Sequence, residues 1–70
     1  MGNKLTEREK EVLFCLCKKG ILNRKAIAKA LIVSETTVAT HIDNLLKKTQ
    51  THKIEILMIR YFKGLLNEYI

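Results

Sequence analysis

Hydrophobic residues recur at helical spacing along most of this chain, and polar capping residues divide the pattern into four segments. The first segment begins with a capping box, in which Thr6 can accept a backbone N–H and Glu9 can reach back to the helix start. Gly20 is a natural helix stop. The apolar positions before it lie at helical spacing: Val12, Leu13, Leu16 and Cys17. The pattern therefore predicts a first helix over about residues 7–19.

Two further helices are predicted in the middle of the chain. Asn23 is a suitable cap for the second helix, and Ser34 is a good cap for a third helix from about Glu35 to Lys48. The buried stripe of the second helix comprises Ile27, Ala28 and Leu31. Ile32 breaks the pattern, at a position where many such turns have glycine.

The spacing of these two helices is that of a helix-turn-helix over about residues 24–48. The small residue Ala28 lies where the helices approach most closely, and Val38, ten residues later, packs back from the third helix. The opposite face of the third helix carries mostly short or polar side chains. An ordinary αα-hairpin shows the same spacing, so this signal alone leaves two interpretations open.

The fourth helix, over about residues 53–67, is too apolar for a helix that packs on one core. Its apolar residues fill an arc of roughly 220°, whereas about 100° usually suffices for one core. We interpret the surplus as a self-association surface, although a helix that contacts another domain gives the same pattern. The candidate dimerisation residues are Leu57, Met58, Tyr61, Phe62, Leu65 and Leu66.

Composition narrows the class of protein. The 70 residues allow one small domain, residues 1–70, and 47% hydrophobic content with three glycines and no proline favours an all-α fold. Thirteen Lys and Arg against seven Asp and Glu give a net charge of +6. This excess favours a polyanionic partner such as nucleic acid, with solubility as the plain alternative. No apolar run approaches the roughly 20 residues of a membrane span, so we expect no membrane association.

The two cysteines and the polar residues predict neither an enzyme nor a metal site. Cys15 and Cys17 point roughly 200° apart on a helix, so they can neither bridge nor chelate together. Buried free thiols are expected instead, and these fit a reducing cytoplasm. We find no nucleophile with a base, no paired carboxylates on one face and no ligand cluster. We therefore expect no catalytic activity, no cofactor and no metal.

Two blocks of the sequence indicate a family more specifically than the helix spacing does. "LTEREKEVL" (residues 5–13) and "IAKALIVSETTVATHIDNLLKK" (residues 27–48) resemble the LuxR-type, or GerE-type, helix-turn-helix domain, and nearly every fixed position of that family's pattern is met. The resemblance implies a four-helix DNA-binding domain of a bacterial transcription factor, at the nucleoid in the cytoplasm. It also implies that the third helix reads the major groove and that the fourth commonly forms a dimer. The chain is similar in length to a small stand-alone regulator and to the output domain of a larger one.

The chain departs from the family's pattern at several positions. The link between the first two helices is longer than usual, and Ala26 stands where the family has glutamate before Ile-Ala. Ala39 follows Thr-Val at a position that often carries a base-contacting lysine. The Ala39 departure puts any base-recognition code taken from the family in doubt.

The candidate DNA-binding residues lie on the third helix and beside it. They are Ser34, Thr36, Thr37, Ala39, Thr40, His41, Asp43, Asn44, Lys47 and Lys48, with Arg24 and Lys25 on the second helix. Hydroxyls at a helix N-terminus can bond phosphate, although Ser34 is better explained as a cap. Ala39 and the Thr40 methyl can contact a thymine methyl, and Asp43 can accept from cytosine N4.

Several of these residues have a second interpretation. Asp43 can repel phosphate at wrong sites instead of reading a base, or it can simply pair with Lys47 on a solvated face. His41 is expected to pack or to bond a phosphate, and Asn44 and Lys48 are expected on the side of the DNA backbone. The cations of the second helix are expected to lie across the backbone, and each can equally be a solvated surface charge.

The predicted function is a sequence-specific transcriptional regulator that binds double-stranded DNA as a homodimer, with RNA polymerase as a further candidate partner. The alternative is a protein-interaction module that uses the same fold to bind another regulator or the polymerase. Ala39 and Asp43 favour that alternative, because neither residue attracts a polyanion.

Overall fold

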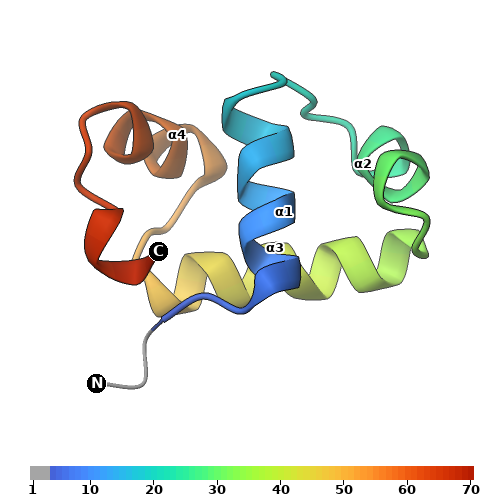
Figure 1. Ribbon diagram of the computed structural model, residues 1–70, viewed down its shortest axis with the longest axis horizontal. Coiled ribbons are helices and arrows are strands. Elements are labelled where there is room, and N and C mark those ends of the chain that lie inside the picture. The colour runs from blue at the N-terminus through green and yellow to red at the C-terminus, as the bar shows by residue number, and fades with distance from the viewer. Residues whose placement is uncertain (1–3) are drawn as a thin grey trace.

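The computed structural model describes residues 4–70, which form four α-helices and one short 3₁₀ helix. The elements are α1 (Glu7–Cys17), α2 (Arg24–Leu31), α3 (Glu35–Lys48), α4 (Ile54–Phe62) and η1 (Asn67–Tyr69). In Figure 1, α1 stands in the centre and crosses the long helix α3, while α2 and α4 lie on opposite sides of α1. The predicted all-α, four-helix fold is confirmed.

Side-chain caps begin the first three helices where the sequence predicts them. The Thr6 hydroxyl accepts the Glu9 N–H at 3.2 Å, and the Thr6 N–H donates to the Glu9 carboxylate at 2.9 Å, which completes the capping box. The Asn23 side chain caps α2 and the Ser34 side chain caps α3, each by accepting backbone N–H groups of the first turn. These caps satisfy backbone N–H groups that have no partner within the helix.

A residue in the left-handed conformation ends each of the helices α2, α3 and α4. Ile32 follows α2 with φ 58°, Gln50 follows α3 with φ 54°, and Gly64 follows α4 with φ 76°. In each case the next residue donates its N–H to a carbonyl five residues back, at 2.9 or 3.0 Å. This is the Schellman arrangement, for which glycine is the usual left-handed residue. Only α4 has the glycine, so two of the three turns are made by residues that disfavour them.

The predicted extent of the fourth helix is wrong. We expected a helix over residues 53–67, but α4 ends at Phe62, because Gly64 turns the backbone and directs Leu66 into the core. The segment then runs back to the start of the described chain, where the Leu5 N–H donates to the Tyr69 carbonyl at 2.8 Å. The first helix is also shorter than predicted and ends at Cys17.

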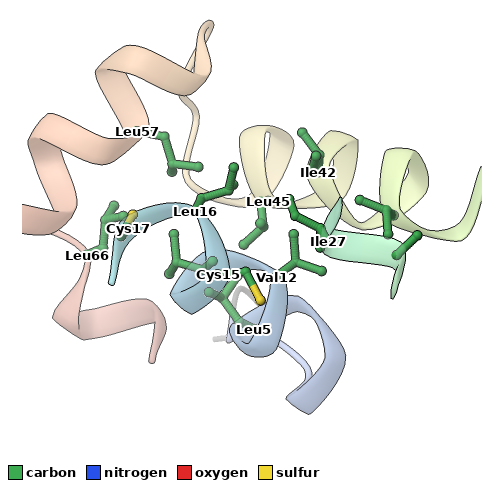
Figure 2. Close-up of a cluster of buried hydrophobic side chains, with 13 residues drawn as sticks. Leu5, Val12, Cys15, Leu16, Cys17, Ile27, Ile42, Leu45, Leu57 and Leu66 are labelled. Carbon is green, nitrogen blue, oxygen red and sulfur yellow. The ribbon is translucent and has the colours of Figure 1, made fainter. Parts of the chain in front are cut away.

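All four helices contribute to one buried apolar cluster, which Figure 2 shows. It contains Leu5, Val12, Leu13, Cys15, Leu16, Cys17, Ile27, Ala28, Val38, Ile42, Leu45, Leu57 and Leu66. Both cysteines are free and buried, as predicted, and burial raises the pKa of the Cys17 thiol to about 11. The core therefore fixes α3 from one side and leaves its opposite side to solvent.

Candidate nucleic-acid interface

Helices α2 and α3 form the predicted helix-turn-helix. Ala28 and Val38 are both buried where the two helices meet, as the spacing requires. The turn between them begins with Ile32, which is 90% exposed and left-handed. A β-branched residue rarely adopts the left-handed conformation, so this turn carries backbone strain. Because the Ile32 side chain is exposed, buried contacts do not offset that strain.

The N-terminal end of α3 is held by its own side chains. The Ser34 hydroxyl accepts the Thr37 N–H at 3.1 Å and lies 2.8 Å from the Thr37 hydroxyl. Ser34 is thus the cap that the sequence predicts, and its partner hydroxyl is the neighbouring threonine. Thr36, in the same turn, is exposed. The end of the helix therefore offers exposed hydroxyl groups and backbone N–H groups at the positive end of the helix dipole.

A continuous exposed stripe runs along α3 on the side away from the core. Thr36, Thr40, Asp43 and Lys47 are all exposed and recur at helical spacing. The Thr40 hydroxyl donates to the Thr36 carbonyl at 3.1 Å, so its lone pairs and methyl group are what it can present outward. In the described chain no ion pair joins Asp43 to Lys47, so the surface pair considered from the sequence is not formed.

Three further candidates on α3 are half-buried at the edges of this stripe: Ala39, His41 and Asn44. Each keeps part of its side chain accessible. Within residues 4–70 the buried Nδ1 of His41 has no hydrogen-bond partner. Packing therefore accounts for part of the His41 environment, as the sequence suggested.

Lys48, which was expected on the side of the DNA backbone, forms an ion pair inside the fold. Its ammonium is 2.8 Å from the Glu9 carboxylate and 3.3 Å from the Lys4 carbonyl. Burial raises the pKa of Glu9, but hydrogen bonds from Lys48 and Thr6 and the charge of Lys48 together hold that pKa below 4.5. The neighbouring Lys47 is exposed.

Two cations of α2, Lys25 and Lys29, lie beside the start of α3. Arg24, Lys25 and Lys29 are all exposed. An open hollow of about 640 Å³ lies next to the turn, and its lining includes Lys25, Lys29 and Ser34, with Glu35 also present. The structure thus brings two predicted backbone cations and the capping hydroxyl to one side of the helix-turn-helix.

A buried polar cluster at the C-terminal end of α3 was missed by sequence reasoning. Thr49 and Thr51 are buried, their hydroxyls lie 2.9 Å apart, and Arg60 of α4 donates to both residues. The partners lie nine and eleven residues from Arg60, so no helical or turn periodicity marks them. The only signal in the sequence was the pair of threonines separated by one residue. The residue between them is left-handed in the structure.

The candidate dimerisation residues divide between the core and the surface. Leu57 and Leu66 are fully buried in the chain's own core, visible in Figure 2, which corrects their assignment to a dimer surface. Met58 and Tyr61 are half-buried. We define the α4 apolar surface by its exposed residues, with their exposed fractions: Ile56 (43%), Ile59 (53%), Phe62 (67%) and Leu65 (56%). Ile56 and Ile59 were not among the candidates.

Residues 4–70 hold no group of three or more His, Cys, Asp or Glu side chains placed to bind a metal ion. None of the helices in this range has the length and apolar character needed to cross a membrane.

Comparison with protein-family models matches residues 3–60 to GerE, described as bacterial regulatory proteins of the luxR family. The matched range contains α1, α2, α3 and most of α4. Comparisons with curated proteins and with solved structures gave no significant match.

Proposed function

The chain belongs to the luxR family of bacterial regulatory proteins, a family of DNA-binding helix-turn-helix domains, and on this premise we propose that it regulates transcription by reading specific DNA sequences. The whole chain, residues 1–70, acts as one such unit. The observation that carries the proposal is the exposed stripe of Thr36, Thr40, Asp43 and Lys47, which lies opposite the buried face of α3. A helix with this division can enter the major groove while its other side stays packed.

The start of the helix-turn-helix supplies the proposed phosphate contacts. Ser34 and Thr36 stand at the N-terminus of α3, where backbone N–H groups and hydroxyls favour an anion. Lys25 and Lys29 of α2 lie beside the same end, and Arg24 is exposed at the start of α2. Lys47 adds an exposed cation farther along α3, and it replaces Lys48 in this role. These groups fix the orientation of α3 on the duplex.

The middle of the exposed stripe supplies the proposed base contacts. Thr40 offers a methyl group and an acceptor, Ala39 offers a methyl group, and the Asp43 carboxylate accepts from cytosine N4. His41 and Asn44 lie at the edges of the stripe. The accessible part of each side chain contacts the DNA backbone. The short side chains allow α3 to approach the base edges closely.

We further propose that two copies pair through the α4 apolar surface. Ile56, Ile59 and Phe62 recur every three residues, and their exposure in a single chain leaves a patch that association removes from water. Met58 and Tyr61 lie at its margin, half-buried. A two-fold dimer of this kind reads an inverted repeat, with its recognition helices about 34 Å apart.

The second candidate function is a protein-interaction module that binds another regulator or RNA polymerase. The observation that favours it is Asp43, which is exposed on α3 and repels a polyanion unless it meets a base donor. The α4 apolar surface is equally compatible with such a partner. DNA affinity separates the two candidates.

The experiment begins with selection of bound sites from a random DNA pool, followed by affinity measurements at increasing salt. The proposal predicts an enriched motif and a logarithm of affinity that falls linearly with the logarithm of salt concentration. Asp43→Ala should change the preferred bases. Glu68→Ala is a matched control, because it removes the same charge from an exposed position on η1, and it should leave the preference unchanged. A pool that shows no enrichment, with no salt-dependent binding, favours the interaction module.

Sedimentation of charged variants tests the dimer. Phe62→Glu should yield a folded monomer with full-site affinity strongly reduced and half-site affinity nearly kept. Leu57→Glu, on the same helix but fully buried, should unfold the domain instead. A parent chain that sediments as a monomer at micromolar concentration, and remains one on DNA, contradicts the proposed dimer.

A further inference from the structure

Helix α4 is joined to α3 by a short segment, residues 49–53, and packs mainly against α1 rather than along α3. Figure 1 shows α4 beyond the C-terminal end of α3, on the far side of α1 from α2. Both helices pack on α1, and beyond that shared packing the orientation of α4 relative to α3 depends on what holds this joint.

The joint is held by a directional chain of hydrogen bonds. Arg60 Nη1 donates to the Thr49 carbonyl and to the Thr51 hydroxyl, each at 2.7 Å. The Thr49 hydroxyl donates to the Leu45 carbonyl at 2.7 Å, so its contact of 2.9 Å with Thr51 uses the Thr51 proton. The chain thus runs from the guanidinium of α4 through two buried hydroxyls to the last turn of α3. Such chains strengthen one another in a low-dielectric environment.

Charge reinforces this geometry. Thr49 is the C-cap of α3, so its carbonyl lies at the negative end of the helix dipole, where a cation is favourable. Arg60 uses both hydrogens of one nitrogen, which a flexible lysine ammonium cannot place with the same planar geometry. The contact joins two helices and does not merely cap one.

We propose that Arg60 is a positioning residue that sets the angle between α4 and α3 and thereby the half-site spacing that the dimer accepts. This rests on the proposed function, in which α4 pairs two copies and α3 reads DNA. The 14 residues of α3 span about 21 Å. A 10° change at the joint therefore moves the far end of α3 by about 4 Å, slightly more than the 3.4 Å between base pairs.

The test measures affinity for an isolated half-site and for inverted repeats whose spacing varies by one and two base pairs around the optimum. Arg60→Met retains the stem of the side chain and removes the guanidinium. Lys63→Met removes the same charge from an exposed position just after α4 and is the matched control. Thr51→Val removes one acceptor and keeps the charge, and it serves as the milder variant where Arg60→Met is too unstable to assay.

Arg60→Met removes both hydrogen bonds of the guanidinium and should lose at least about tenfold in discrimination between the optimal and neighbouring spacings, the factor expected for one charge-assisted hydrogen bond alone. Its half-site affinity should stay within about twofold, because the helix-turn-helix is untouched. Thr51→Val should show a smaller loss of discrimination in the same direction, and Lys63→Met should keep the sharp optimum of the parent.

The inference is overturned if the parent has a sharp optimum and both Arg60→Met and Thr51→Val retain it. A parent that binds half-sites but has no spacing preference overturns the dimer, and this inference with it. A parent that binds no selected site overturns the proposed function itself.

Discussion

The two ends of α3 have similar polar residues and use them in opposite ways. At the N-terminal end, Ser34 and Thr37 bond each other and the local backbone, and Thr36 is exposed. At the C-terminal end, Lys48 pairs with Glu9 of α1 and Thr49 receives Arg60 of α4. The polar side chains of the first end bond within that end, which packs on α2 through apolar contacts, whereas those of the second end bond to two neighbouring helices. A recognition helix can therefore be anchored at one end and present the other end to a ligand.

Adjacent lysines show the same contrast within one turn. Lys47 is exposed, while Lys48 is partly buried against a carboxylate that is almost fully buried. The backbone periodicity decides this, because neighbouring helical positions point about 100° apart. Net charge is accordingly a poor guide to which cations are available to DNA.

Replacing each of these two lysines in turn by methionine tests the contrast and has the largest expected effect. Lys48→Met leaves the buried Glu9 carboxylate without its cation and should lower the free energy of unfolding by roughly 2–3 kcal/mol, somewhat less than a fully buried broken pair, because Thr6 still donates to Glu9. DNA affinity per folded molecule should be unchanged. Denaturant unfolding and fluorescence anisotropy give the two quantities.

Lys47→Met is the matched control for this pair. Its stability should change by no more than about 0.5 kcal/mol, while the slope of log affinity against log salt should fall by about one. If Lys48→Met lowers the salt slope without changing stability, the assignment of the two lysines is reversed.

Acid should selectively weaken the contacts at the C-terminal end of α3, which is anchored to α1 and α4. Since the pKa of Glu9 in the folded chain is below its ordinary value of 4.5, its ion pair stabilises the fold above pH 4.5 and is lost as pH falls through the folded-state pKa. The loss should be smaller than in Lys48→Met, because a protonated Glu9 is neutral. Glu9→Gln should flatten the pH dependence of unfolding below pH 4.5, measured by denaturant titration. An unchanged pH profile in Glu9→Gln contradicts the ion pair's contribution.

Substitutions at Ser34 test the N-terminal end of α3, which we call its open end. Ser34→Ala should cost about 1 kcal/mol by loss of the α3 cap, and Ser34→Asp should keep the cap while its charge repels phosphate and weakens DNA binding. Thr6→Ala removes the corresponding cap of α1, far from the proposed interface, and should cost about as much stability with DNA affinity per folded molecule intact. Equal DNA affinity for Ser34→Asp and the parent places the phosphate contacts elsewhere.

The smallest expected effect concerns the left-handed residues that flank α3. Ile32→Gly should raise the free energy of unfolding by up to about 1 kcal/mol, because glycine relieves the strain and the exposed isoleucine loses little packing. Gln50→Gly, at the other end, should gain less, because glutamine is unbranched. Thermal unfolding compares them. A loss of stability in Ile32→Gly points to a packing role for this side chain.

Local signals predicted most of the fold. Thr6, Asn23 and Ser34 cap the helices that the sequence assigns to them, because a cap involves only residues within one turn. The exposed face of α3 follows from the same periodicity. Gly64 was not identified as a stop from the sequence, because the apolar residues on both sides of it suggested a continuous helix over residues 53–67.

Long-range polar contacts could not be predicted in the same way. The partners Glu9 and Lys48 are 39 residues apart, and Arg60 reaches the joint from a separate helix. The surplus of apolar residues in the fourth helix was a valid signal, yet its division between core and surface depends on where Gly64 turns the chain. The turn places Leu66 inside and Leu65 outside, while helical periodicity within α4 places Leu57 inside and Phe62 outside.

The contrast between the two ends of α3 is tested most directly by nuclear magnetic resonance, with ¹⁵N-labelled chain titrated with a duplex selected from a random pool. The backbone amide shifts should be largest from Ser34 to Asp43 and at the first turn of α2, and small from Thr49 to Thr51. Shifts that are largest at Thr49–Thr51, with Ser34–Asp43 unperturbed at saturating DNA, would contradict the proposal that the open end of α3 reads DNA.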